Sequence, residues 1–167
     1  MPRLFVAIWP PAEVTAVLAA LPRPDLAGVR WSVPEQWMVK VRPLGHVDER
    51  LGPLLADALQ AELAGAPAIH CVLGPVTRRL GGQWLGVPVS GLDDVAATVF
   101  DATEDLVPVT HPQPFHADIV LARGRVPTDL AGTPISAEWT ADAVSLVADR
   151  SSPHAIRFEA LAWVPLG

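Results

Sequence analysis

Two segments of the chain alternate polar and aliphatic residues in the same way. In "WMVKVRPLG" (37–45), Met38, Lys40 and Arg42 alternate with two valines. In "HADIVLARG" (116–124), polar residues likewise come between aliphatic ones, and the segment ends in Arg-Gly. A period of two places successive side chains on opposite faces of a strand. We therefore predict two strands, each with one aliphatic face and one face that carries polar groups.

The rest of the chain changes between strand-like and helix-like patterns. Short apolar or alternating runs predict strands at 3–10, 29–33, 37–44, 68–78, 82–89 and 116–124, and two long strands around a turn at 150–153. Apolar residues at helical spacing predict helices at 12–21, 48–65 and 91–107. This order predicts an α+β fold, in which two pseudo-symmetric lobes, each an antiparallel sheet with outer helices, surround a central cleft. We expect one two-lobed domain over residues 1–167.

The net charge and the cysteine content narrow the range of functions. A net charge of −6 over 167 residues argues against broad, nonspecific nucleic-acid binding, but it leaves room for a local basic groove. The single cysteine, Cys71, excludes a disulfide framework and a cysteine-rich zinc site, and its apolar neighbours predict a buried, inert thiol. We expect neither a metal nor a cofactor.

The predicted location follows from the start of the chain. The first predicted strand begins at residue 3 with no signal peptide before it, and no apolar run is long enough to cross a bilayer. We expect a cytoplasmic monomer without a membrane partner. Lys40 is the only lysine among 12 basic residues, and it lies in the middle of a predicted strand.

The chain contains, in this order, "RLFVAIWPPAEV", "GVRWSVPEQWMVKVRPLG", "QWLGV", "PFHADIVLARGR" and "AVSLVADRSSPHAIRFEALAWVPLG". These five segments resemble the two-histidine phosphoesterases, and within them the LigT-like RNA 2′,3′-cyclic phosphodiesterases, historically called 2′-5′ RNA ligases. The resemblance implies a His-x-Thr-x motif in each lobe. In that chemistry two imidazoles flank a phosphate as general base and general acid, and the threonine hydroxyls bind its oxygens.

Neither motif is intact in this chain. Alignment on "VRPLG" places Met38 at the first histidine and Lys40 at the first threonine. Alignment on "LARGR" places Asp118 at the second histidine and Val120 at the second threonine. Methionine cannot transfer a proton, and valine cannot bind a phosphate oxygen. We therefore expect a divergent relative of the cyclic phosphodiesterases that has lost the standard mechanism.

Three roles remain open for the altered cleft. Lys40 and Asp118 form a structural ion pair that fills a disused site, or they act together as an acid–base pair in different chemistry. In the third interpretation, Lys40, Arg42 and Arg123 bind an anion without converting it. A purely structural or partner-binding role is a further hypothesis.

Two loop histidines precede the second strand of the cleft. His111 and His116 flank "PQPF", and either one reaches the mouth of the cleft or lies on the plain surface. We include His116, with Arg42 and Arg123, among the candidate ligand-binding residues. The expected partner is a small, nucleotide-like or otherwise anionic ligand, with RNA ends among the candidates.

Overall fold

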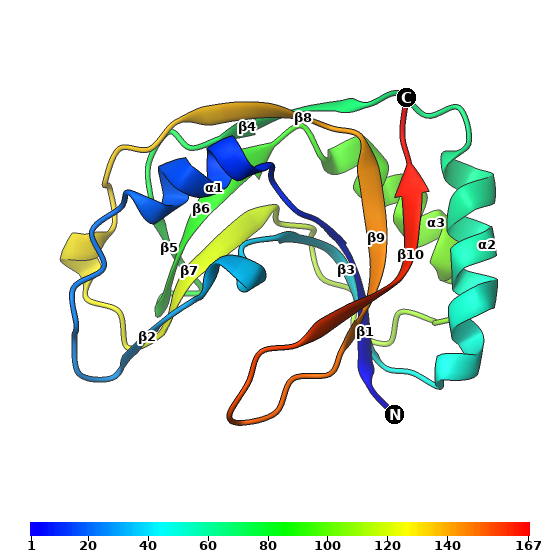
Figure 1. Ribbon diagram of the computed structural model, residues 1–167, viewed down its shortest axis with the longest axis horizontal. Helices are drawn as coiled ribbons and strands as arrows, with labels where there is room; N and C mark the ends of the chain where they lie inside the picture. Colours follow the sequence, from blue (N-terminus) through cyan, green and yellow to red (C-terminus); the bar gives the residue numbers. More distant parts are fainter.

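The computed structural model describes residues 1–167 as ten strands and three α-helices (Figure 1). The strands are β1 (Arg3–Ile8), β2 (Val29–Trp31), β3 (Val39–His46), β4 (Ile69–Leu73), β5 (Arg78–Leu80), β6 (Trp84–Ser90), β7 (Asp118–Gly124), β8 (Ala137–Ala141), β9 (Ala143–Asp149) and β10 (Phe158–Pro165). The helices are α1 (Ala12–Ala19), α2 (Gly52–Leu63) and α3 (Asp93–Thr103). The α+β class expected from the sequence is confirmed.

All of the strands pair in antiparallel fashion in one curled sheet with the order β10-β9-β1-β3-β7-β6-β4-β8. Strand β2 adds to β7, and β5 adds to β6. The strands β3 and β7 pair only at Val39 and Ile119, so the sheet consists of two halves joined at this point. The curl of the sheet leaves a concave face between the halves (Figure 1).

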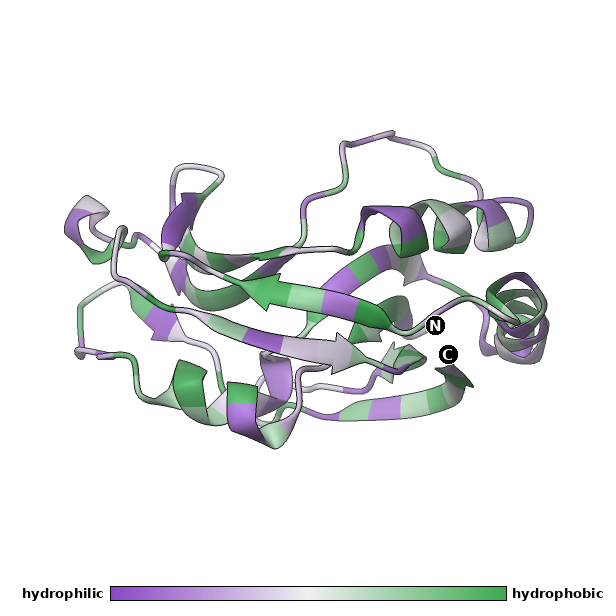
Figure 2. Ribbon diagram, turned by 90° about the horizontal axis from the view of Figure 1, so that it is seen from above, coloured by the Kyte–Doolittle hydropathy of each residue, from purple (hydrophilic) through white to green (hydrophobic).

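The helices cover the outer side of the sheet. Helices α2 and α3 contact each other and pack against β10 and β3, whereas α1 lies near β8 (Figure 1). Leu55, Leu59 and Leu63 recur every four residues along α2 and are almost fully buried, as expected for an amphipathic helix on a core. Figure 2 shows the alternation of apolar and polar residues along the strands. The main core of 34 buried residues draws on both halves of the sheet.

The tail differs from the two long strands predicted for it. The break at Asp142 separates β8 from β9, and β8 leaves the first half of the sheet to pair with β4 in the second half. The predicted 68–78 strand is also interrupted, because β4 ends at Leu73 and β5 begins at Arg78 as the partner of β6. Alternating patterns do not reveal which strand is the neighbour of which.

The environment of Cys71 agrees with the sequence-based prediction. Its side chain is fully buried, and burial raises the pKa of the thiol to about 11. A thiol that stays protonated in this way is a poor nucleophile. Among the helices, none has both the length and the apolar character that a membrane crossing requires.

Candidate functional site

A β-bulge in β3 decides which of its polar side chains face the concave side. Lys40 lies opposite Ala7 of β1, but Arg42 lies opposite Val6, so Val41 is an extra residue in the ladder. A bulge of this kind shifts the alternation of side chains by one position. Lys40 therefore shares the concave face with Ala7, whereas Arg42 turns to the helix side together with Val6.

Arg42 is consequently a buried structural residue, with 3% of its surface exposed. Its guanidinium donates hydrogen bonds to the Thr103 hydroxyl and to the Val107 carbonyl, both at the C-terminal end of α3. It also lies over the Phe100 ring, 4.9 Å from the centroid. Burial lowers the pKa of this guanidinium, and Glu104 acts in the opposite direction. The expected position of Arg42 in the cleft is wrong, because that expectation assumed unbroken alternation along the strand.

Lys40 is a cation without a carboxylate partner. Its Nζ lies 4.9 Å from the centroid of the Phe5 ring, and its ammonium forms no salt bridge. Although the residue is solvent-exposed overall, partial burial lowers the pKa of the ammonium. Repulsion from Arg123 adds to this effect, while attraction to Asp149 opposes it.

A second bulge, in β7, places Arg123 near Lys40. Ala122 lies opposite Leu85, and Val120 lies opposite Gly86. Leu121, between Val120 and Ala122, is therefore the extra residue in the ladder. After this bulge Arg123 lines the same cavity as Lys40.

The guanidinium of Arg123 also forms no salt bridge. It lies 5.0 Å from the centroid of the Trp84 ring, and its Nε is buried without any hydrogen-bond acceptor. Burial lowers the pKa of Arg123, repulsion from Arg30 lowers it further, and Asp149 raises it. The wall of this cavity therefore carries three cations without a salt bridge, Lys40, Arg123 and Arg3, and one carboxylate, Asp149.

Asp118 is bound by a residue that the sequence did not suggest. Its carboxylate accepts a hydrogen bond from Arg78 Nη2 of β5 at 2.8 Å, and only 12% of its side chain is exposed. The antiparallel register at Val39 and Ile119 places Asp118 beside Lys40 on the neighbouring strand. The expected ion pair between Lys40 and Asp118 is nevertheless wrong, because Arg78 holds the carboxylate. The interpretation of this pair as a plug loses its basis.

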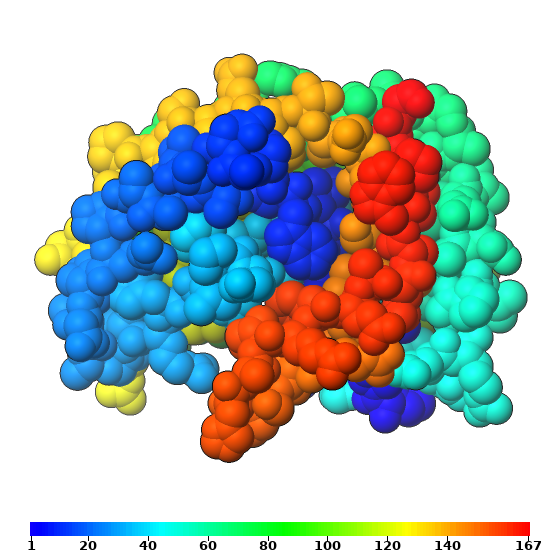
Figure 3. All heavy atoms as spheres, in the orientation of Figure 1, coloured from blue at the N-terminus to red at the C-terminus, as the bar shows by residue number.

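The concave side of the sheet holds a cavity of about 480 Å³, which we call the cleft. Figure 3 shows this face hollowed between the blue-to-cyan segment that leads into β3 and the orange C-terminal hairpin, and residues of both segments line the cleft. The residues that line the cleft include Met38, Lys40, Arg123, Arg3, His46, Asp149, Phe5 and Phe158. Of the four motif positions, Met38 and Lys40 therefore line the cleft. Asp118 and Val120 do not line it, but they lie beside Lys40 and Met38 on the neighbouring strand.

An aromatic cluster adjoins the cations. The Phe5 and Phe158 rings meet edge to face with centroids 5.6 Å apart, and Trp9 lies 6.4 Å from Phe5 and 6.2 Å from Phe158. Met38 belongs to the same small apolar cluster. The concave face thus offers flat aromatic surface directly beside positive charge.

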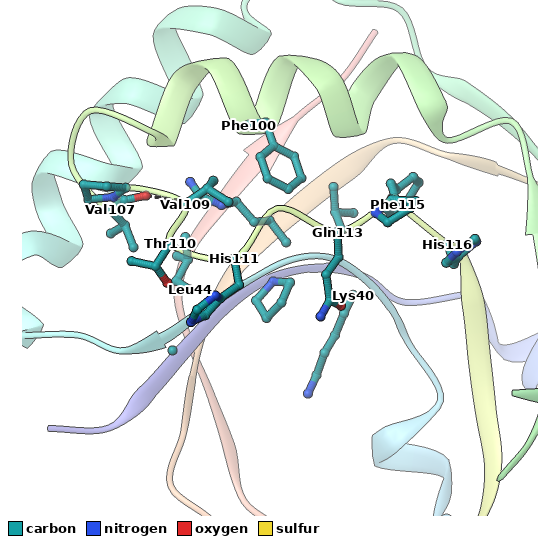
Figure 4. A pocket seen from close by; sticks show the side chains of 16 residues that line it. Lys40, Leu44, Phe100, Val107, Val109, Thr110, His111, Gln113, Phe115 and His116 are labelled. Carbon is teal, nitrogen blue, oxygen red and sulfur yellow. Dashed lines mark hydrogen bonds between the residues drawn. The ribbon is translucent and has the colours of Figure 1, made fainter. Parts of the chain in front are cut away.

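A second cavity, of about 580 Å³, lies between β3 and the loop of residues 108–116, and we call it the β3 groove. Figure 4 shows His111 and Gln113 pointing from this loop toward β3, from which Lys40 extends. His111 and His116 both line the β3 groove, and neither lines the cleft. The expected contact of His116 with the cleft is therefore not made.

Of the other histidines, His46 at the end of β3 lines the cleft, while His70 and His154 lie on the surface. His46 accepts a hydrogen bond from Arg3 Nε at 3.2 Å and lies 3.0 Å from the Met1 carbonyl. His70 lies 3.6 Å from Glu138 on the exposed side of β4, and His154 lies in the exposed turn before β10. No cluster of three His, Cys, Asp or Glu side chains suitable for a metal occurs.

The sequence did not indicate Arg3, Phe5, His46, Asp149 or Phe158 as cleft residues. Arg3 and Phe5 alternate along β1, so the pattern of "RLFVAIW" contains the signal for both of them. Phe158 lies opposite Asp149 in β9, and this register is not visible in the sequence. The partnership of Arg78 with Asp118 likewise depends on strand order.

Superposition on solved structures finds proteins with the same fold, independently of the sequence patterns. TT0787 of Thermus thermophilus superposes with a TM-score of 0.84 at 20% identity, over 98% of this chain and 97% of that one. E. coli LigT complexed with 3′-AMP gives a TM-score of 0.83 at 20% identity, over 99% and 98% of the chains. A structure described as a phosphoesterase gives 0.80 at 20% identity, over 99% of each chain. LigT has also been crystallised with NADP+, ATP and phosphate.

The sequence comparisons find less. No protein-family model and no curated protein matches this chain. At 20% identity the structural likeness establishes the architecture, and it agrees with the resemblance carried by the five sequence segments. The chain has the fold of E. coli LigT and of the LigT-like two-histidine phosphoesterases.

Proposed function

We propose that the cleft binds a small, nucleotide-like anion and does not hydrolyse it by the two-histidine route. The observation that carries this proposal is the meeting of Lys40 and Arg123 in one cavity, where neither cation forms a salt bridge and Asp149 is the one carboxylate of the lining. Arg123 lowers the pKa of the neighbouring Lys40 ammonium, and two positive charges so placed gain from a bound anion. The buried, unpartnered Nε of Arg123 is one hydrogen-bond donor that such an anion would satisfy.

The aromatic cluster supports a ligand that carries a base as well as a phosphate. Trp9 and Phe158 are half-buried on the same concave face as the cations, whereas Phe5 is only 3% exposed, and a nucleobase can stack on such partly exposed rings for about 1–3 kcal/mol. The complexes of E. coli LigT with 3′-AMP, NADP+ and ATP give the same ligand class for a protein of this fold.

The absence of hydrolysis follows from the residues at the motif positions. Met38 offers no proton donor or acceptor, and the carboxylate of Asp118 is held by Arg78. Acid–base chemistry by Lys40 is the second candidate, since the pKa of its ammonium is lowered. That chemistry would need a second acid–base group other than Asp118, because Arg78 binds the Asp118 carboxylate. A cytoplasmic, monomeric protein remains part of the proposal.

Isothermal titration with 3′-AMP and with inorganic phosphate tests the binding. Lys40→Met and Arg123→Met should each weaken the binding by about 10-fold or more, the value of a charge-assisted hydrogen bond. Arg50→Met is the matched control, because it removes the same charge at an exposed site that lines neither cavity. Equal affinities in the wild type and in both cleft variants would overturn the proposal.

A further inference from the structure

The β3 groove is larger than the cleft, and the polar side chains of its loop have no protein partners. His111, Gln113 and His116 line it, and no hydrogen bond involves any residue of the 108–116 loop. Three of the nine residues of the loop are prolines, which keep the segment extended and remove backbone donors. The loop therefore faces β3 with donors that nothing in the protein uses.

The loop is fixed at both of its ends. Arg42 donates to the Val107 carbonyl immediately before the loop, and Val89 N donates to the Ala117 carbonyl immediately after it, at 2.9 Å. On the other side of the groove, β3 beyond Val39 pairs with β1 alone, so its outer edge is open. The groove is thus held open between a strand edge and an anchored loop.

The charge of the lining indicates the chemistry of the occupant. The lining contains two basic residues, Lys40 and Arg42, and two histidines, but no Asp or Glu. The donors of Arg42 are taken up by Thr103 and Val107. The groups left for a ligand are the Lys40 ammonium, the two imidazoles and the Gln113 amide. Donors without carboxylates favour an anion.

The β3 groove and the cleft share a wall. Lys40, Pro43 and Gly45 line both cavities, and they lie along β3 between them. A molecule with one anionic group at Lys40 and Arg123 therefore has a direct path over β3 to the histidines of the loop. This inference rests on the proposed function, and it adds to that function the number of anionic groups that the ligand carries.

We propose that the ligand carries two phosphate groups, one bound in the cleft and one in the β3 groove. Lys40 and Arg123 hold the first phosphate, and His111 and Gln113, which lie next to each other along the loop, hold the second (Figure 4). The chemical class is a nucleotide with two separately attached phosphates, and its base faces the aromatic cluster of the cleft.

The test compares two probes by isothermal titration: 3′-AMP, with one phosphate, and adenosine 3′,5′-bisphosphate, with two. The wild type should bind the bisphosphate at least about 10-fold more tightly, because a second charged contact adds of the order of 1.4 kcal/mol. His111→Ala combined with Gln113→Ala should abolish this preference and leave the affinity for 3′-AMP within about twofold. The control, His70→Ala combined with His154→Ala, removes two exposed imidazoles outside both cavities and should keep the preference.

Two results would overturn this inference, and a third would overturn the proposed function as well. One is a wild type that binds the two probes equally, and the other is a preference that survives in the His111/Gln113 variant. Failure of both probes to bind would overturn the proposed function itself. Melting curves of the double variants show whether a lost preference reflects the site or the fold.

Discussion

Arg78 binds Asp118 at 2.8 Å, from β5 to β7, and this contact keeps the carboxylate away from Lys40. Asp118 stands where the resemblance to two-histidine phosphoesterases places a catalytic histidine. A free carboxylate there would repel a phosphate at Lys40, the residue beside it on the neighbouring strand. Arg78 neutralises this charge, so the cleft retains its net positive character.

We predict that Arg78 matters to ligand affinity through Asp118. Arg78→Met should leave an uncompensated carboxylate next to Lys40 and weaken the binding of 3′-AMP by about 5- to 10-fold. Adding Asp118→Asn to Arg78→Met should restore most of the affinity, and the coupling should appear in a double-mutant cycle measured by titration calorimetry. Additive effects of the two substitutions would contradict a role through the pair.

We predict a dependence of stability on alkaline pH that comes from Lys40. Its pKa in the fold is lowered from the ordinary value of 10.5, so between the two values the unfolded chain binds more protons than the native one. The free energy of unfolding of the wild type should therefore rise, relative to Lys40→Met, as the pH increases from about 8 towards 10.5. Urea denaturation at a series of pH values measures this difference.

Lys40→Arg is the control for the pH series. Arginine keeps its charge throughout this range, so this variant should lack the relative gain that the wild type shows. A relative gain of the same size in Lys40→Arg would assign the effect to another titrating group.

We predict that Arg42 supports the fold and not the ligand directly. Arg42→Met leaves the buried Thr103 hydroxyl and the Val107 carbonyl without their donor, and it should reduce the free energy of unfolding by about 2–3 kcal/mol. Arg50→Met, at a side chain that is 91% exposed, should change it by less than about 0.5 kcal/mol. A loss for Arg42→Met as small as that for Arg50→Met would contradict the anchoring role.

Much of the fold was predictable from local patterns. The periodicity of the aliphatic residues indicated most of the strands and all three helices, because burial of one face determines each element. The predicted helix at 48–65 is shorter in the structure, since a 3₁₀ turn over Glu49–Leu51 precedes α2. The separate strand β8 was missed, because its partner β4 lies far away in the sequence.

The candidate site was predictable only in part, and the bulges explain why. Strict alternation placed Lys40 and Arg42 on one face, but the extra residue at Val41 sends them to opposite faces. The partner of Asp118 could not be predicted, because Arg78 reaches it only through the pairing of β5, β6 and β7. Local sequence carries no record of such pairings.

We predict that the missing motifs can be restored. The variant carries four substitutions: Met38→His, Lys40→Thr, Asp118→His and Val120→Thr. It should hydrolyse adenosine 2′,3′-cyclic phosphate above the wild-type background, because each acid–base group contributes about 10²–10⁴-fold to such a rate. Restoring the first motif alone, with Asp118 and Val120 unchanged, should remain at background. A folded fourfold variant without activity would contradict the alignment of the two strands.

The central claim is that the cleft binds a phosphate ligand without hydrolysing it. A single ³¹P NMR series with adenosine 2′,3′-cyclic phosphate and purified wild-type protein measures both properties. We predict a saturable change of the cyclic phosphate signal that Lys40→Met and Arg123→Met weaken, with no monoester signal above that of a protein-free sample. Formation of a 2′- or 3′-monoester that depends on Lys40, or a cyclic phosphate signal that the protein leaves unchanged, would contradict the claim.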